Sequence, residues 1–489
     1  IGMPLPREYG GLQVPAAMQF MVLAQLSRSC VGSSTQMAFF TSIAEMVHRY
    51  CDKETADRIV PQIINGELSG SMNLTEPGCG SDLGAIKTSA TPTTDGKYLL
   101  NGSKIFITNG GGGVAFVLAR IKGGPVGLEG ISMFFVEQEI TNEKGEKILN
   151  FKVAKNEEKM GMHASFTCEI VYENTVGVLI GKENEGFKYM LHLMNEARIA
   201  VGMQGLGGIE AALDYAVNYA TERTQFGKPL KDLPLMKRNL EDFCTERDAI
   251  RALLMDTISH YDVFQFLDLK KKQTGDLTKE EEKKLKEATL WTRKRTPLVK
   301  YYACEKYTEL SQRALQVLGG YGFMKEYPLE RIHRDSFGPL LYEGTSQIQA
   351  LMALKDLLKY ALKDPKRFLS SVMNKHPGLE LVKGNNPWHH TYLSTHYRFK
   401  KKLIALLFKA LKPKEGSMFN SKSWMKEENV EHMMVHAETL TQALCYMETL
   451  RVLCAHAELD QSRADLFNRY YILVMPRLEG IFSDWELRA

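Results

Sequence analysis

The sequence contains no apolar run that approaches the roughly 20 residues needed to span a bilayer. It also lacks a CxxC pair, and its eight cysteines are too scattered for a dense disulfide pattern. No internal repeat is present, and Ile1 opens the chain without an initiator Met or a signal-peptide pattern. We therefore expect a cytoplasmic protein with reduced thiols, no transmembrane helix and a missing piece before Ile1.

The length and the distribution of apolar residues predict several domains. A chain of 489 residues with 44% hydrophobic and 25% charged residues has globular composition and is long enough for two to four domains. Apolar residues at helical spacing predict helices within the first seventy residues (18–26, 37–50 and 55–64). Short β-type runs follow (98–100, 103–108, 115–121, 131–136 and 169–172), and Asn101-Gly102 predicts a hairpin between two of them.

Apolar residues at helical spacing return after Gly186. We expect helices over 187–221 and 236–260, then a third from Thr278, where Glu281 completes a capping box, to Gly319-Gly320. The charged segment 267–286 is expected to be a solvated connection plus the exposed start of this helix, and a fourth helix follows Thr345. The fold class is therefore mainly α with a central antiparallel β domain. The expected domains are 1–70, 71–180, 181–363 and an appended, mostly helical region over 364–489.

The segment TEPGCGSD, residues 75–82, could bind an anionic or carbonyl-rich ligand. Gly78 and Gly80 around Pro77 can expose backbone N–H groups, and Thr75 and Ser81 add hydroxyls. When the segment is taken alone, an ordinary Pro-Gly turn is the favoured interpretation.

Two further segments could contact a flat ring and a pyrophosphate. Phe106 and Thr108 in KIFITNGG share one face of an alternating strand, where an aromatic beside a hydroxyl could shelter a ring. Arg223 and Gln225 in RTQFGKPL lead into a turn, and the guanidinium could clamp a pyrophosphate. A lone phenylalanine is more often part of a core, and a lone arginine at a helix end is usually a surface partner.

Glu343, in LLYEGTSQIQ, lies two residues before the expected N-cap Thr345, on a bend that contains glycine. The helix N-terminus would hold the pKa of this carboxyl down, whereas desolvation by an apolar substrate would raise it towards the range of a general base. This combination suits proton abstraction next to a carbonyl. Simple electrostatic capping of the helix is the alternative.

These segments, together with ALQVLGGYGF at 314–323, resemble the acyl-CoA dehydrogenase family in type, order and spacing over residues 1–363. The resemblance implies a helical N-terminal domain, a β-barrel-like middle domain and a four-helix bundle, with FAD between the latter two. It implies contacts to the flavin and its phosphates from Leu74, Thr75, Ser81, Phe106, Thr108 and Thr345. It also implies contacts to the FAD of a neighbouring subunit, in a homodimer or dimer of dimers, from Arg223, Gln225, Phe226, Gln316 and Gly320.

The resemblance implies that Glu343 removes the α-proton of an acyl-CoA thioester while the β-hydride moves to the flavin, giving a trans-2-enoyl-CoA. Ser81, Arg198 and Gly344 would lie on the substrate side. Some members place the base immediately before the arginine, where this chain has Ala197, and Glu196 lies about 100° away around the helix. Glu343 is therefore the better candidate. Electron-transfer flavoprotein is the implied acceptor.

The appended region begins with a basic stretch. Residues 364–414 hold eleven Lys or Arg and two acidic residues, a net charge of +9, with Lys400, Lys401 and Lys402 before the apolar LIALLFKAL. The segment 398–414 could lie on an anionic membrane, attract nucleic acid or pack on the body, and packing is favoured. Because His389, His390 and His396 have no Cys or acidic ligand nearby in the sequence, we expect no metal site.

With its extra C-terminal helical domain, the chain resembles the branch of the family that acts on methylthio-propionyl-CoA. Two other functions stay open, a flavin-containing DNA-associated relative of this family and an acyl-CoA oxidase, although we do not expect nucleic acid as a partner.

Overall fold

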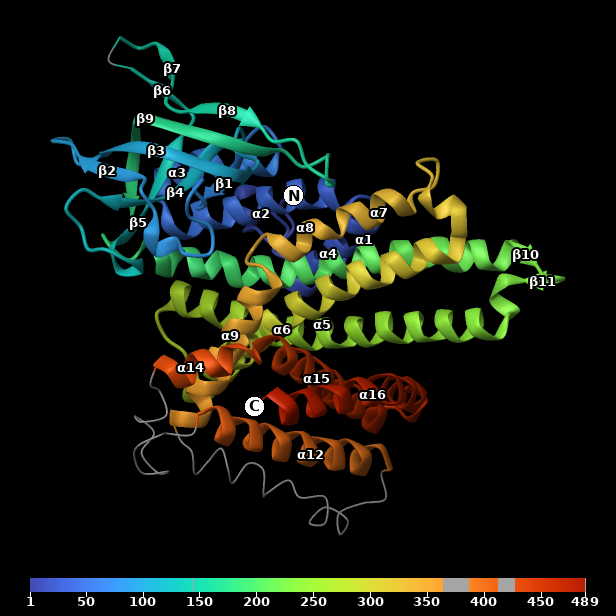
Figure 1. Ribbon diagram of the computed structural model, residues 1–489. Helices are drawn as coiled ribbons and strands as arrows, with labels where there is room; N and C mark the ends of the chain where they lie inside the picture. Colours follow the sequence, from blue (N-terminus) through green and yellow to red (C-terminus); the bar gives the residue numbers. More distant parts are fainter. Residues whose placement is uncertain (143, 364–386, 412–426, 489) are drawn as a thin grey trace. The chain divides into compact units, whose positions relative to one another are not determined.

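The computed structural model describes residues 1–142, 144–363, 387–411 and 427–488 (Figure 1). The chain divides into two compact units, and each is described by itself. The first unit contains Ile1–Ala211 and Arg331–Pro339, and the second contains Ala212–Glu330 and Leu340–Ala489. None of the helices described is both long enough and apolar enough to cross a membrane.

The first unit opens with three helices, as predicted: α1 (Ala16–Ser29), α2 (Val31–Tyr50) and α3 (Lys53–Ile64). The carboxylate of Asp52 caps α3 by accepting the Thr55 N–H at 2.7 Å. Apolar residues three or four apart on α2 and α3 bury one face of each helix in a shared core, which fixes the helices against the sheet that follows.

The sheet contains seven strands: β1 (Ser69–Asn73), β2 (Ser89–Pro92), β3 (Tyr98–Thr108), β4 (Gly113–Ile121), β5 (Ile131–Glu137), β8 (Lys152–Asn156) and β9 (Thr167–Ile180). Because β4 pairs with both β2 and β5, the path β4-β2-β3-β9-β5 closes on itself and makes the sheet barrel-like. Most pairings are antiparallel, but β1 and β2 each pair with β4 in parallel, which the sequence did not show. A hairpin of β6 (Glu139–Thr141) and β7 (Lys147–Leu149) extends from this sheet (Figure 1).

The hairpin predicted at Asn101-Gly102 is wrong, because β3 continues through both residues. Gly102 lies at a register shift against β9, where a Cβ would come within 2.7 Å of the Thr88 hydroxyl oxygen. The glycine therefore serves a close approach of two chain segments and not a turn. The turn between β2 and β3 lies at Asp95-Gly96, where Gly96 has φ +80°.

Long helices dominate the second unit. Helix α4 (Gly186–Glu222) enters it, and α5 (Pro234–Thr274), α6 (Lys279–Leu318) and α9 (Ser346–Lys363) follow, with α5 beside α6 (Figure 1). The capping box of Thr278 and Glu281 is confirmed. The prediction that α5 ends near residue 260 and is followed by a long solvated connection is wrong. The helix continues to Thr274, ends at Gly275 with φ +78°, and leaves only residues 275–278 as the connection.

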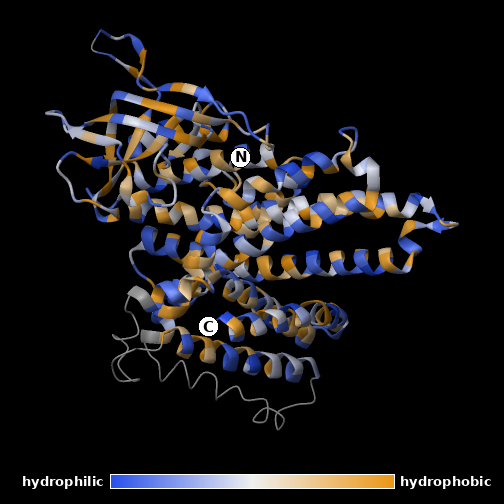
Figure 2. Ribbon diagram, viewed as in Figure 1, coloured by the Kyte–Doolittle hydropathy of each residue, from blue (hydrophilic) through white to orange (hydrophobic). Residues whose placement is uncertain are grey.

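The appended region supplies α12 (Pro387–Ala410), α14 (Glu427–Met434), α15 (Ala437–Leu459) and α16 (Ala464–Arg488). Hydrophobic and hydrophilic segments alternate along α12 (Figure 2), and its apolar residues, including Leu403 and Leu406, are buried where α12 packs on α15 and α16. Lys402 pairs with Glu486 of α16. Packing on the body, the arrangement favoured from the sequence, is therefore confirmed for 398–411. The peripheral membrane contact stays a prediction, and 412–414 lie outside the described residues.

Candidate active site

In the first unit, the loop after β1 is fixed to β3 by a buried ion pair. The ammonium of Lys104, which is fully buried, donates to the carboxylate of Glu76 and to the Leu74 carbonyl, each at 2.9 Å. Glu76 also accepts the N–H groups of Lys87 and Thr88. Burial would raise the pKa of Glu76, but the Lys104 charge and these hydrogen bonds outweigh it and hold the pKa below its usual range. These contacts therefore fix the first residues of the loop that carries Thr75 and Ser81.

The same contacts bring the loop to Phe106. The Ile105 N–H donates to the Thr75 carbonyl at 2.9 Å, so Thr75 lies beside the residue that precedes Phe106. A β-bulge between Lys104 and Ile107 gives Phe106 a left-handed backbone, with φ +60°, and leaves its ring 62% exposed. Phe106 and Thr108 flank the buried Ile107, which agrees with their predicted common face.

Gly78 and Gly80 are exposed, and open space surrounds the first of them. Neither has a positive φ, so the turn does not require glycine. Their small size instead leaves the backbone N–H groups accessible to a ligand. Ser81 is exposed on the same loop.

Arg198 lies on the first part of α4 with 4% of its surface exposed, and one guanidinium nitrogen donates to the Asn195 side-chain oxygen at 3.4 Å. Glu196 is also buried, at 3% exposure, whereas Ala197 is partly exposed. A buried carboxylate therefore lies next to the alternative position of the base.

In the second unit, Glu343 lies on a strained bend between α8 (Phe337–Leu341) and α9. Its φ is +58°, followed by +92° at Gly344, and its Oε2 atom is shielded from solvent. The hydroxyl of Thr345 accepts the Ile348 N–H at 3.3 Å, which confirms Thr345 as the N-cap of α9. A glutamate rarely adopts a left-handed backbone, and such strain is typical of functional sites.

Two buried side chains that the sequence analysis missed hold this bend. The Lys300 ammonium on α6 donates to the Gly344 carbonyl at 2.7 Å and the Leu340 carbonyl at 3.2 Å. The Gln349 amide nitrogen donates to the carbonyls of Glu343 and Gly344, both at 3.0 Å. Both side chains are fully buried. In the sequence, the sign of this role was that Lys300 is a single lysine inside the apolar stretch 297–304.

Arg223, Gln225 and Phe226 lie on a small hairpin of β10 (Thr224–Gln225) and β11 (Lys228–Pro229), between α4 and α5 (Figure 1). Phe226 and Gly227 both have positive φ, as a two-residue type I′ turn requires. All three predicted residues are exposed, and Phe226 is 89% exposed.

Gln316 and Gly320 lie near the same end of the second unit. Gln316 is exposed on the last turn of α6, and a Cβ at Gly320 would meet open space. The rings of Tyr219, one turn before Arg223, and Tyr321, next to Gly320, are 6.4 Å apart. The structure therefore brings together these two parts of the predicted cofactor contact.

Three family models match the chain in sequence order. They describe the acyl-CoA dehydrogenase N-terminal domain at residues 1–67, the middle domain at 71–175 and the C-terminal domain at 184–358. An acyl-CoA dehydrogenase of Bacillus subtilis is 33% identical over 362 residues, which cover 73% of this chain and 86% of that protein. The chain belongs to the acyl-CoA dehydrogenase family. Members of this family are oxidoreductases.

Solved structures support this membership in the acyl-CoA dehydrogenase family. Butyryl-CoA dehydrogenase from Megasphaera elsdenii matches with a TM-score of 0.62 and 30% identity, covering 73% of this chain and 86% of that chain. An acyl-CoA dehydrogenase complexed with FAD from Bacillus anthracis matches with a TM-score of 0.80 and 21% identity, covering 100% of this chain and 79% of that one. The second match extends the likeness in fold to the appended helices.

The histidines of the appended region depart from expectation. His389 has no Cys or acidic neighbour nearby in the sequence, but Cys454 and Glu458 of α15 lie beside it in the structure. These residues are 65 or more positions away along the chain, so spacing in the sequence could not reveal them.

Proposed function

We propose that the protein is an FAD-dependent acyl-CoA dehydrogenase that converts an acyl-CoA thioester to a trans-2-enoyl-CoA, with Glu343 as the base. The observation that carries this proposal is the left-handed backbone of Glu343, held by Lys300 and Gln349 within the segment that matches the family. Such strain persists only where the surroundings impose it, and it fixes the direction of the carboxylate.

The residues present fit FAD. The loop at 75–82 offers the hydroxyls of Thr75 and Ser81 and accessible N–H groups at Gly78 and Gly80, which suit phosphate and carbonyl oxygens. The exposed ring of Phe106 suits a flat heterocycle. When bound, FAD would supply the hydride acceptor. The residues that the family resemblance assigns to the substrate are Ser81, Arg198 and Gly344.

The chain itself must move one proton and stabilise one developing charge. The Glu343 carboxylate takes the α-proton, which the thioester carbonyl makes weakly acidic. The Glu343 backbone N–H donates to the carbonyl oxygen as negative charge grows there, and the fixed bend keeps this donor in place. Lys300 and Gln349 act as positioning residues.

We further propose that the assembly is at least a dimer. The exposed Arg223, Gln225 and Phe226 on their hairpin, together with Gln316 and Gly320, would reach the cofactor of a neighbouring copy of the chain. Electron-transfer flavoprotein is the acceptor we expect for the reduced enzyme. The boundaries at residues 70, 180 and 363 between the four expected domains stay predictions.

The test is an anaerobic titration of the purified flavoprotein with saturated acyl-CoAs from short to long chain, followed by the loss of visible flavin absorbance. At least one chain length should bleach the wild-type protein. Glu343→Gln should keep its flavin but bleach about 10²- to 10⁴-fold more slowly, the usual contribution of a general base. Glu196→Gln is the comparison variant. Normal bleaching by Glu343→Gln with none by Glu196→Gln would assign the base to α4.

The same preparation separates two rival functions. Peroxide production without an added acceptor would identify an oxidase. A salt-sensitive shift of DNA mobility, with no bleaching by any acyl-CoA, would favour the DNA-associated relative. In the described part of the basic stretch, Arg398 and Lys402 pair with acidic residues of α16. This pairing argues against the DNA-associated function.

A further inference from the structure

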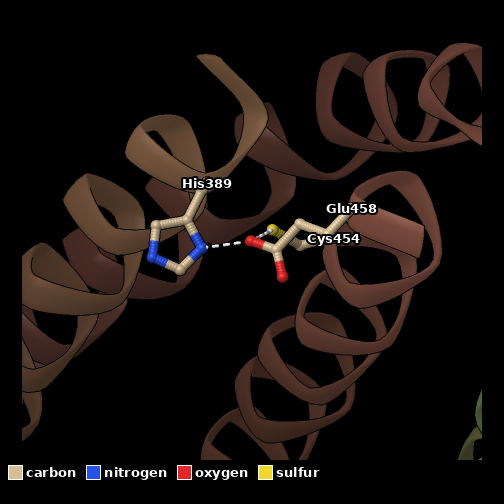
Figure 3. Close-up of side chains that lie close together, drawn as sticks. All are labelled: His389, Cys454 and Glu458. Carbon is tan, nitrogen blue, oxygen red and sulfur yellow. Dashed lines mark hydrogen bonds and ion pairs between the residues drawn. The ribbon is translucent and has the colours of Figure 1, made fainter. Parts of the chain in front are cut away.

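Three potential metal ligands from two helices meet in the appended region. His389 lies on the first turn of α12, and Cys454 and Glu458 lie one turn apart on α15, so both point to the same side of that helix (Figure 3). One ligand atom of each residue lies within 4.8 Å of the others. No other group of this kind occurs within the residues described.

The spacing of these atoms is close to that of a metal site. The Cys454 Sγ is 3.9 Å from the Glu458 Oε1, and His389 Nδ1 contacts the same oxygen. Around tetrahedral zinc, bond lengths near 2.0–2.3 Å place neighbouring ligand atoms about 3.4–3.6 Å apart. The sulfur needs to move only slightly, and the histidine and carboxylate must separate enough to admit an ion between them. Both side chains are partly exposed and can make this adjustment.

We propose that His389, Cys454 and Glu458 form a binding site for Zn²⁺ that links α12 to α15. Imidazole nitrogen, thiolate sulfur and carboxylate oxygen are the donors that zinc takes in proteins. Three protein ligands leave the fourth position to water. On binding, the Cys454 S–H bond breaks, the S–Zn bond forms and the proton passes to solvent, with no change of oxidation state.

The location places the ion between two helices of the appended region. Cys454 is buried and Glu458 exposed, so the site lies at the edge of the contact between the two helices. Its residues lie outside the three domain matches that define the family. The inference therefore stands or falls independently of the proposed dehydrogenase reaction. A hydrogen bond between His389 and Glu458 links the same two helices.

Cobalt is a suitable probe because Co²⁺ occupies zinc sites and a thiolate ligand adds a charge-transfer absorption. The full-length protein is treated with a chelator, dialysed and titrated with Co²⁺, and then with Zn²⁺ as a competitor. We expect one equivalent of Co²⁺ with a thiolate charge-transfer band, displaced by Zn²⁺. Cys454→Ser should lose the band, and His389→Ala should weaken binding by more than about tenfold. Zn²⁺ should raise the melting temperature of the wild-type protein and of His390→Ala, but not that of Cys454→Ser.

The neighbouring His390 provides the matched control, because it is exposed and lies outside the group. His390→Ala should bind Co²⁺ as the wild type does. If Cys454→Ser fails to fold, His389→Ala and Glu458→Gln still test the site, since both positions are partly exposed. Absence of stoichiometric Co²⁺ binding would leave only the hydrogen bond between His389 and Glu458 and overturn the proposal. Equal loss of binding in His390→Ala and His389→Ala would also overturn it.

Discussion

Replacing Lys104 by Met tests whether the buried pair with Glu76 organises the loop of the first unit. Methionine has nearly the volume of the lysine stem but carries no charge. The substitution leaves the Glu76 carboxylate, 7% exposed, with its N–H donors from Lys87 and Thr88 but without a counter-ion. It also removes the donor to the Leu74 carbonyl.

Breaking a buried ion pair by removing one partner costs about 3–5 kcal/mol. No reduction for solvent screening applies, because the lysine side chain is completely buried. For a unit of this size, about 1 kcal/mol shifts the melting temperature by about 2–4 °C, so we expect a decrease of roughly 6–20 °C. The affinity for FAD should fall as well, because Leu74, next to Thr75, loses its anchor on β3.

Differential scanning calorimetry of the apoprotein, combined with FAD titration, measures both effects. The double variant Lys104→Met/Glu76→Gln should be more stable than Lys104→Met alone, because the uncompensated anion is then removed. Lys87→Met is the matched control, since its side chain is exposed on the same segment. A decrease of less than about 3 °C for Lys104→Met, or a double variant no more stable than the single one, would refute the reasoning.

Three further predictions concern individual residues. Gly344→Ala should slow anaerobic flavin reduction by about 10²-fold without loss of FAD, because φ is +92° and the new Cβ would lie 2.8 Å from the Gln349 amide nitrogen. Normal reduction would show that the bend is not needed. Phe226→Asn should raise stability by about 1 kcal/mol, because asparagine tolerates the left-handed backbone, yet weaken self-association about 10- to 100-fold in sedimentation. Unchanged association would place Phe226 outside the subunit contact. A hydrogen bond from Lys270, together with the Thr278 N–H, lowers the pKa of Glu281 to about 2. The ionised Glu281 side chain therefore stabilises the fold at pH values above the usual glutamate pKa, and this stabilisation is lost as the pH falls. The difference in melting temperature between wild type and Glu281→Gln should shrink between about pH 5 and pH 3. A difference that grows in this range would contradict the pairing.

The sequence predicted the helices well, because their signals are local. Apolar spacing located α1, α2 and α3, and the capping box of Thr278 located the start of α6. The same local rules failed at Gly102, since the reason for glycine there is the close approach of Thr88 from another segment. The long α5 was cut short because a charged surface resembles a solvated connection when burial is not visible.

The candidate site was predicted in part. Family motifs identified Glu343 and Thr345, and the N-cap is confirmed, whereas the catalytic role stays a prediction. Lys300 and Gln349 were missed because they act on backbone carbonyls 44 and about 5 residues away, and no motif encodes such contacts. The prediction of no metal site at His389 considered only its neighbours in the sequence, whereas Cys454 and Glu458, its neighbours in space, belong to another helix.

The left-handed backbones of Phe106, Phe226 and Glu343 have a consequence for protein engineering. Each costs roughly 1–2 kcal/mol relative to a residue in an ordinary conformation, and together they amount to a large share of a typical folding free energy of about 5–15 kcal/mol. Selection of variants for heat resistance alone should therefore accumulate glycine or asparagine at these three positions. A library meant to preserve turnover should hold all three constant, and recovery of the original residues under selection for activity would mark them as sites where evolution has favoured chemistry over stability.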